Sequence, residues 1–418
     1  MIIKEIGRGV HGKVKLAEDL DTGELVAIKI VDKQSRRRQL GYSILRAKNY
    51  HRQQYHEALD EYNESEQKIR REIAILKKCI HPHVVRLREV IDDPASRKIY
   101  LALEYMEGGE ILWRDEQNHR PVLSMDQARS IFRDVVSGLD YLHYQGIIHR
   151  DIKPANLLLT HDHIVKISDF GVSYFNQHLA GIHSQYDDEI DRELAETAGT
   201  PAFFAPELCS SVENYTTQDN RHITKAIDVW ALGVTLYCLV YGRCPFTAAT
   251  EFELFDIIPT APLVFPTPEE IGFQTPETLK DLFERLLAKQ PENRITLEQI
   301  KHHPWVVEDL QDPTVWWKEA DPTLYKAVEV TDEEVSQAVT IMDRLRKSIR
   351  RISSSLISLT HHFSRHHSKP VVSVSTSLHP LDEEQEKPTW PFQMDRNDSS
   401  TSSLSGLVVN FSRSNNNK

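Results

Sequence analysis

The stretch "IIHRDIKPANLLL", residues 147–159, encloses a set of polar residues between two apolar runs. Asp151, Lys153 and Asn156 stand there in the spacing H-R-D-x-K-x-x-N. A polar turn between two buried elements is the simpler interpretation of such a loop. The type and spacing of every charged residue favour a functional loop instead.

A second aspartate follows in "KISDFGVS", residues 166–173, where Asp169 comes at the end of a predicted strand. An aspartate and an asparagine that converge from two loops supply hard oxygen ligands, the kind that Mg²⁺ prefers. The sequence therefore predicts a magnesium site at Asn156 and Asp169.

A glycine-rich loop lies near the start of the chain, in "GRGVHGKV", residues 7–14, with the spacing G-x-G-x-x-G-x-V. Glycines let backbone amides approach phosphates where a Cβ would clash, although a tight turn alone also explains them. The loop lies between strand-like runs rather than between a strand and a helix. This arrangement argues against a Rossmann unit and predicts a hairpin that covers phosphates. The first strand barely fits after Met1, so we expect an N-terminal extension to be missing.

A lysine and a glutamate form a candidate pair. "VAIK", residues 26–29, places Lys29 on the next strand, where a lysine can also simply extend to solvent. Glu72 shares a helical face with Ile69, Ile73 and Leu76, so a carboxylate faces the core. A buried carboxylate needs a cation. Lys29 is the candidate, and the pair would place its ammonium on the phosphates of ATP.

The composition of the whole chain restricts its class. Its 418 residues carry a net charge of −12, which argues against nucleic acid as the main partner. The four cysteines show no metal-ligand or C-x-x-C spacing, which predicts reduced thiols inside the cell. No signal peptide is visible, and the longest apolar run, residues 229–241, is too short to span a bilayer. We therefore expect a cytoplasmic protein, with the nucleus left open.

Strand patterns precede helical ones along the chain, which predicts an α+β fold with two lobes. We expect a β-rich small lobe over residues 1–105, with a polar surface insertion at 34–66. The helical large lobe follows over 106–307, in which Ser124 is a candidate N-cap and Gly146 a candidate helix stop. A regulatory segment is expected at 308–360. The Ser-, His- and Asn-rich residues 361–418 have the composition of a disordered tail.

These motifs resemble the eukaryotic protein kinases, with every signature in order over residues 2–307. The fold, ATP and Mg²⁺ as cofactors, and a protein substrate follow from this resemblance. It implies that Asp151 accepts the proton of the substrate hydroxyl, that Lys153 steadies the γ-phosphate, and that Glu72 holds Lys29 against the α/β-phosphates. It implies the following ATP contacts: Ile6, Gly7, Gly9, Gly12, Val14, Ala27, Lys29, Glu104, Met106 and Glu110.

The resemblance also implies supporting residues. Leu103 would be the gatekeeper beside the hinge. A buried column would join the lobes, and it consists of Leu76, Leu87, His149 and Phe170, with Asp228 at its base. In the activation segment, which includes Arg150, Thr197 and Thr200, Glu207 of "GTPAFFAPE" would pair with Arg294 of "PENRI". Lys153 together with Thr200 is similar to serine/threonine rather than tyrosine kinases.

A narrower resemblance is to the calmodulin-dependent protein kinase kinases. It is carried by "EIAILKKCIHPHVVRLREVIDDP" (72–94), "ETAGTPAFFAPEL" (196–208), "DVWALGVTLYCLVYGRCPF" (228–246) and "VEVTDEEVSQAV" (328–339). "SRRRQLG", "EYMEGGEILWR" and "DFGVSYF" are most similar to fungal members, which activate the AMP-activated kinase. The resemblance implies a kinase that phosphorylates the activation-loop threonine of another kinase. The insertion departs from the family's basic, proline-rich one because it contains no proline. The alternatives are a pseudokinase-like scaffold and a serine/threonine kinase of another pathway that does not respond to calmodulin.

Two further segments carry regulatory hypotheses. Residues 186–196 are crowded with carboxylates that would lie near Arg150 and substitute for an activating phosphate, or would only keep a mobile loop soluble. Residues 341–359 form a basic amphipathic pattern that suits calmodulin, an anionic membrane, an acidic groove of the same molecule, or packing on the large lobe. The position after the kinase domain matches the family's autoinhibitory and calmodulin-binding segment. On that basis we expect truncation after Val330 to raise activity.

Overall fold

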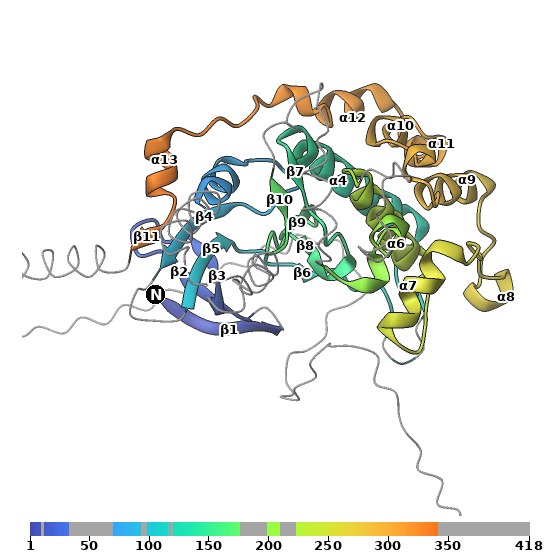
Figure 1. Cartoon of the computed structure of the whole chain (residues 1–418), viewed down its shortest axis with the longest axis horizontal. Helices are drawn as coiled ribbons and strands as arrows, with labels where there is room; N and C mark the ends of the chain where they lie inside the picture. The colour runs from blue at the N-terminus through green and yellow to red at the C-terminus, as the bar shows by residue number, and fades with distance from the viewer. Residues whose placement is uncertain are drawn as a thin grey trace, which may run out of the picture.

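An antiparallel sheet forms the small lobe of the computed structural model, which describes residues 1–9, 12–32, 70–92, 98–115, 117, 120–175, 199–209 and 223–341. Its first five strands are β1 (Ile2–Gly9), β2 (Gly12–Glu18), β3 (Leu25–Asp32), β4 (Leu87–Asp92) and β5 (Lys98–Glu104). A sixth strand, β11 (Thr340–Ile341), comes from the far end of the described chain. The order across the sheet is β1-β2-β3-β5-β4-β11 (Figure 1).

β3 lies inside this sheet, between β2 and β5, so its β-branched and apolar residues are covered by neighbours. Val26, Ala27 and Val31 are buried, and Lys29 is in register with Val14 on one side and Leu101 on the other. Residues 70–78 are helical, and Ile73, Ala74 and Ile75 of this helix are buried. The sheet and this helix therefore form the two layers of the small lobe.

Helices dominate the large lobe. α4 (Met125–Tyr144) begins with the predicted cap: Ser124 and Gln127 form a reciprocal capping box. The chain then turns at Gly146, whose φ of 77° is a conformation that glycine adopts without strain. α6 (Ala226–Tyr241) is buried along nearly its whole length, as expected for an apolar run in the centre of a large domain.

Short elements before and after α4 shape the cleft. β6 (Gly109–Glu110), β8 (Leu157–Leu159) and β9 (Val165–Ile167) form one small sheet, and β7 (Ile147–Ile148) pairs with β10 (Tyr174–Phe175). Three 3₁₀ turns follow the loops: η2 (Pro154–Asn156), η4 (Pro201–Phe203) and η5 (Pro206–Leu208). The rest of the lobe contains α7 (Glu251–Thr260), α8 (Pro268–Ile271), α9 (Glu277–Leu286), α10 (Leu297–Lys301) and α11 (Pro304–Val307).

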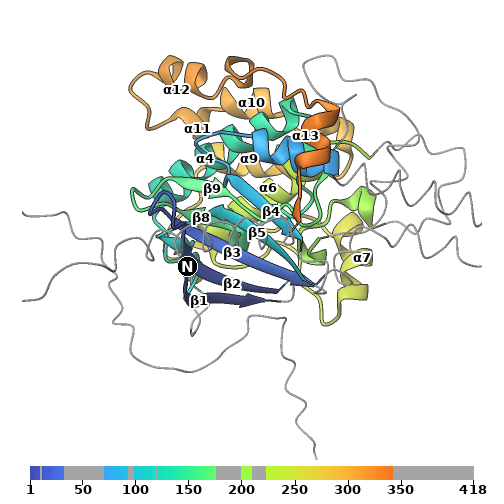
Figure 2. The same ribbon diagram turned by 90° about the vertical axis from the view of Figure 1, so that its left-hand side faces the viewer.

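Residues 308–341 connect the two lobes a second time. After α12 (Pro313–Glu319) on the large lobe, the chain runs back to the small lobe through α13 (Asp332–Gln337) and β11 (Figures 1 and 2). β11 pairs in parallel with β4, where Thr340 is in register with Ile91. The segment expected to be regulatory therefore enters the small-lobe sheet.

The predicted α+β fold with two lobes is confirmed. The insertion at 34–66, Thr197 with the acidic residues of the activation segment, the basic stretch after 341 and the tail at 361–418 lie outside the described residues. Within the described ranges, no helix combines the length and the apolar composition that a membrane span requires.

Candidate active site

A buried aspartate at the start of α6 fixes the loop after β7. Asp228 at the start of α6 accepts backbone hydrogen bonds from His149 (2.8 Å) and Arg150 (2.8 Å), and its Oδ2 lies 2.8 Å from His143 Nε2. Burial raises the pKa of the Asp228 carboxyl, but the bonds to His143 and His149 outweigh this effect and leave the pKa below its ordinary value. The carboxylate thereby holds the left-handed turn at Arg150, where φ is 66°.

Four side chains meet above this base. Asn156 Nδ2 donates to Asp151 Oδ2 at 2.9 Å and to the Asp151 carbonyl at 2.7 Å. Lys153 Nζ lies 2.8 Å from Asp151 Oδ2. Thr200 donates its hydroxyl to Asp151 Oδ1 at 2.8 Å and accepts a bond from Lys153 Nζ at 2.6 Å. The three polar residues of the loop thus converge, and the loop after residue 199 supplies a fourth partner.

The approach of that loop explains the glycine before Thr200. Gly199 has a φ of 119°, and a Cβ there would lie 2.5 Å from the Arg150 carbonyl oxygen. Only a residue without a side chain can pass the catalytic loop so closely. The "GT" pair is therefore set by the geometry of the site.

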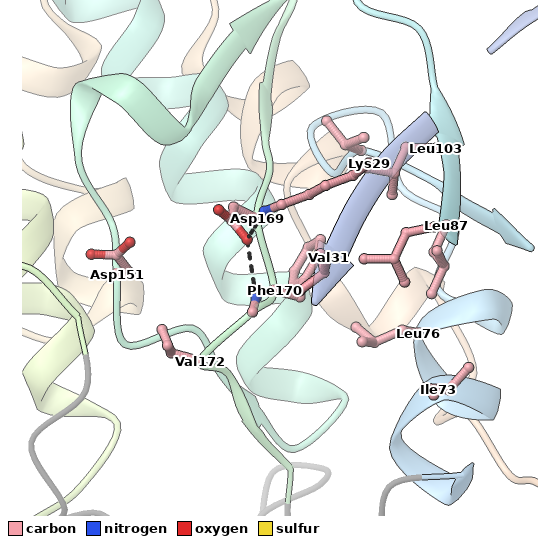
Figure 3. A pocket seen from close by; sticks show the side chains of 13 residues that line it. Lys29, Val31, Ile73, Leu76, Leu87, Leu103, Asp151, Asp169, Phe170 and Val172 are labelled. Atoms are coloured by element: carbon pink, nitrogen blue, oxygen red, sulfur yellow. Dashed lines mark hydrogen bonds and ion pairs between the residues drawn. The ribbon is translucent and has the colours of Figure 1, made fainter. Parts of the chain in front are cut away.

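Lys29 reaches the cleft from the opposite lobe. Its Nζ lies 2.7 Å from Asp169 Oδ1, and Figure 3 shows the side chain extending from β3 to that carboxylate. Asp169 has a φ of 64° and accepts a bond from the Gly171 amide at 3.2 Å. β3 and the loop after β9 thus join the two lobes by an ion pair.

The sequence predicts that Lys29 pairs with Glu72. Among the described residues, Lys29 instead forms its ion pair with Asp169. Glu72 lines a separate small cavity with Ile75, Leu76, Ile147, Ser173 and Phe175. The physical reason is the position of the helix: Glu72 is partly buried but is turned toward β7 and β10. The role expected for Glu72 remains a prediction.

An apolar cavity lies behind Lys29. Leu76, Leu87, Leu103 and Phe170 are among its lining residues, and Figure 3 shows them gathered on the side away from Asp151. The ring of His149 meets Phe170 edge-on, with centroids 5.3 Å apart. The residues of the predicted column therefore lie close together, and Leu103 borders the cavity as expected of a gatekeeper.

The residues expected to contact ATP lie around the same opening. Gly7 and Gly9 pair with Val14 and Gly12 in the β1–β2 hairpin, and a Cβ on Gly12 would lie 2.0 Å from the Ile30 carbonyl oxygen. Ala27 is buried on β3 opposite Leu103, whereas Ile6 is exposed.

The connection between the lobes carries the remaining predicted contacts. Met106 is buried, and Glu104 binds Lys166 Nζ at 2.7 Å. Glu110 is exposed on β6. The structure places these residues, and their contacts with a nucleotide stay predictions.

A second buried ion pair supports the substrate side of the cleft. Arg294 binds Glu207 through two parallel bonds, of 2.8 Å and 3.0 Å, and both side chains are almost fully buried. The pair that the sequence predicts is present, and it ties η5 to the base of the large lobe.

Comparison with known proteins decides the family. The protein kinase domain model matches residues 1–306. The chain belongs to the protein kinase family. This kinase chain is 53% identical over 353 residues to the serine/threonine-protein kinase ssp1 of Schizosaccharomyces pombe. The matched region covers 84% of this chain and 49% of that relative.

Two other relatives bear more specific names. SNF1-activating kinase 1 of Saccharomyces cerevisiae is 46% identical over 73% of this kinase and 28% of its own length. The calcium/calmodulin-dependent protein kinase kinase of Caenorhabditis elegans is 38% identical over 82% of this kinase and 58% of its own length. The chain thus spans between about a quarter and three fifths of the curated relatives named here. Its domain is a serine/threonine kinase domain.

The donors of the site fit the cofactors of the family. Kinases transfer phosphate from ATP with divalent metal ions. Asp169 offers a carboxylate. Asn156 donates both of its bonds to Asp151 through Nδ2, so these bonds do not engage its amide oxygen. A metal held by one or two protein oxygens, with the remainder from phosphate and water, is the usual arrangement for Mg²⁺. Within the described ranges no larger acidic or histidine cluster forms a metal site.

Sequence reasoning missed three contacts of this kinase. The bond from Thr200 to Asp151, the Lys166–Glu104 pair and the return of residues 329–341 to the small lobe all join residues far apart in the chain. A signal for the third exists: Thr331 and Glu334 are spaced as a capping box, which the structure shows at the start of α13.

Proposed function

We propose that the chain is an ATP- and Mg²⁺-dependent protein serine/threonine kinase. The observation that carries the proposal is the cluster of Asp151, Lys153, Asn156 and Thr200, with the Lys29–Asp169 pair across the cleft. Asp151 would accept the proton of the substrate hydroxyl as the phosphoryl group transfers, and Lys153 would neutralise the charge on the γ-phosphate. Asn156 and Asp169 would hold the metal.

The contacts of Thr200 also suit a hydroxyl substrate. Its hydroxyl bonds to both Asp151 and Lys153, at 2.8 Å and 2.6 Å. A serine or threonine of a substrate has the same functional group and would approach the same two partners. The names of the relatives as serine/threonine kinases support this class.

The substrate we propose is the activation-loop threonine of another kinase, of the AMP-activated or calmodulin-dependent type. Support comes from the relative named SNF1-activating kinase 1 and the relative named as a kinase kinase. A panel of catalytically inactive kinases, incubated with the full chain and ATP and mapped for the modified residue, tests this. Phosphate on activation-loop threonines is expected; phosphate only on other proteins would favour a kinase of another pathway.

The pseudokinase-like scaffold makes the opposite prediction in the same assay. Lys29, Asp151, Asn156 and Asp169 are all present and lie around the cleft. ATP turnover with any protein substrate excludes the scaffold, and binding of ATP without transfer would establish it. We propose that the protein acts in the cytoplasm, with access to the nucleus left open.

Regulation by calmodulin is proposed for residues 341–359, in line with the relative named as calcium/calmodulin-dependent. The structure changes the design of the test, because a stop after Val330 would also delete α13 and β11. A stop after Ile341 removes the basic stretch and the tail but keeps α13 and β11. Higher activity of that variant, together with calcium–calmodulin activation of the full chain only, is expected. A full chain that equals the variant and does not bind a calmodulin column would contradict the proposal.

A further inference from the structure

The last described part of the chain contacts the small-lobe helix at 70–78. We call residues 329–341 the clip; it comprises α13, β11 and the residues that lead into them. Figures 1 and 2 both show α13 beside the helix at 70–78. The clip contacts a helix that lies far earlier in the chain, as shown by the separation of 251 positions between Lys78 and Glu329.

Cations of the helix bind acceptors of the clip. Lys78 Nζ donates to the Glu329 carbonyl at 2.7 Å and to Glu334 Oε2 at 2.8 Å. Arg70 donates to the Ser336 carbonyl at 3.3 Å, and Lys77 to the Ala338 carbonyl at 3.4 Å. These cations span two turns of one helical face, so the clip contacts the whole described length of the helix.

An apolar cluster lies beneath these polar contacts. Val335 and Ala338 of the clip are buried with Ile73 and Ala74 of the helix, and with Leu87 and Val90 of β4. Ala338 is only 2% exposed. The clip therefore completes a small core that the helix and β4 would otherwise expose to water.

Glu89 of β4 connects the three elements. Its Oε1 accepts bonds from Lys77 of the helix at 3.1 Å and from Thr340 of the clip at 2.8 Å. The parallel pairing of Thr340 with Ile91 fixes the clip to the sheet edge at the same place. The helix is thus fastened to the sheet through the clip as well as by its own packing.

We propose that the clip is a positioning element for catalysis, whose docking holds the helix at 70–78 in the place from which Leu76 lines the cavity behind Lys29. The inference rests on the proposed kinase function. Leu87 makes the connection physical: it packs in the cluster with Val335 and Ala338, and it also lines the cavity with Leu76 and Phe170. Release of the clip would loosen the packing of Leu87 and, through it, the cavity. Removing everything after Val330 should therefore lower kinase activity. The rise in activity expected from the sequence should appear only when the chain stops after Ile341.

The first test uses the full chain with Ala338→Asp. A carboxylate at this buried position must be desolvated, and the nearby Lys77 is already bound to Glu89, so the substitution should shift the docked population about ten-fold or more. We expect kcat/KM to fall about ten-fold, and amide hydrogens of residues 70–78 and 87–92 to exchange about ten-fold faster, while α4 and α6 keep their protection. Gln337→Asp is the matched control, because it adds the same charge at the exposed neighbouring position.

The second test uses a charge exchange between the helix and the clip. Lys78→Glu and Glu334→Lys each place like charges together, and pairs this exposed shift rates by about five-fold at most. The double variant restores an attractive pair, so it should be more active than Glu334→Lys, which equally lacks the Thr331–Glu334 capping box, and should recover protection of the helix. A structural defect unrelated to docking would not be repaired by the second substitution.

Two results would overturn the proposal: wild-type kinetics in Ala338→Asp despite faster exchange in the helix, or a double variant no better than Glu334→Lys. A chain that phosphorylates no substrate would refute the proposed function instead. The exchange measurement would still report whether the clip holds the helix, so the two failures are distinguishable.

Discussion

The floor of the cleft and the helix at 70–78 are built in different ways. In the floor, Asp228 and the catalytic loop are buried and share several short bonds within the large lobe. The helix is held by partly exposed cations and by the clip, whose residues come from the far end of the described chain. Buried and multiply bonded groups have one geometry, whereas groups held by exposed pairs can shift at small cost.

The placement of the acidic residues follows this difference. Asp151 lies where its motif predicts, with Lys153 and Asn156 in contact. Lys29 pairs with Asp169 in this structure, and the pairing of Glu72 with Lys29 stays a prediction. We infer that the large lobe supplies a constant chemical site, and that control acts through the small lobe.

The largest effect is expected from Asp151→Asn, in the floor of the cleft. The variant should bind ATP and lose about three to four orders of magnitude in kcat, because the base and the orientation of the hydroxyl each contribute about 10² or more. Initial rates on a fixed protein substrate, beside an ATP-binding titration, measure both quantities. Wild-type turnover in this variant would disprove the assignment of the base.

A second break removes the charge at the base of the loop. Asp228→Asn leaves a buried amide hydrogen of His149 or Arg150 facing an amide group, at a cost of about 1–3 kcal/mol in the free energy of unfolding. The folded pKa of Asp228 is lowered, so its stabilisation is present above the ordinary value of 3.8 and is lost as the pH falls through the lower folded value. Urea unfolding at pH 7 and below pH 4 should therefore show the gap between wild type and variant narrowing in acid. A gap that stays constant would mean that Asp228 does not titrate as described.

The same contrast explains how far the sequence predicts the structure. The cap at Ser124, the turn at Gly146 and the Glu207–Arg294 pair follow from local patterns or from motifs whose partners are buried. Their positions are fixed by chain geometry and by packing that leaves few alternatives.

What the sequence did not predict depends on distant contacts. The motif at Glu72 gives the residue type but not the position of its helix, which contacts the clip, more than 200 residues later in the chain. The motif at 328–339 was recognised as part of a family pattern, yet its pairing with β4 needed the three-dimensional structure, because a strand of two residues has no periodicity to read.

Glu72→Gln tests the helix at 70–78 directly. If Glu72 serves Lys29 in the productive state, the variant should lose about ten-fold in kcat/KM for ATP, while the free energy of unfolding changes by less than about 1 kcal/mol. Rates across an ATP series and urea unfolding measure the two effects. Glu319→Gln, at an exposed position on α12, is the control for a lost carboxylate. Unchanged rates in Glu72→Gln would show that the helix acts on the cleft without this carboxylate.

The smallest effect is expected from the acidic stretch before Thr200, which lies outside the described residues. Arg150, at the strained turn of the floor, donates its Nε to the Val172 carbonyl at 2.6 Å and is the cation that these carboxylates would neutralise. Changing Asp187, Asp188, Glu189 and Asp191 together to Asn or Gln should lower the activity of dephosphorylated enzyme about two- to five-fold, the scale of exposed ion pairs. Neutralising Asp382, Glu383, Glu384 and Glu386 in the tail removes the same charge and should have no effect. Equal activity in both variants would leave solubility as the role of the acidic stretch.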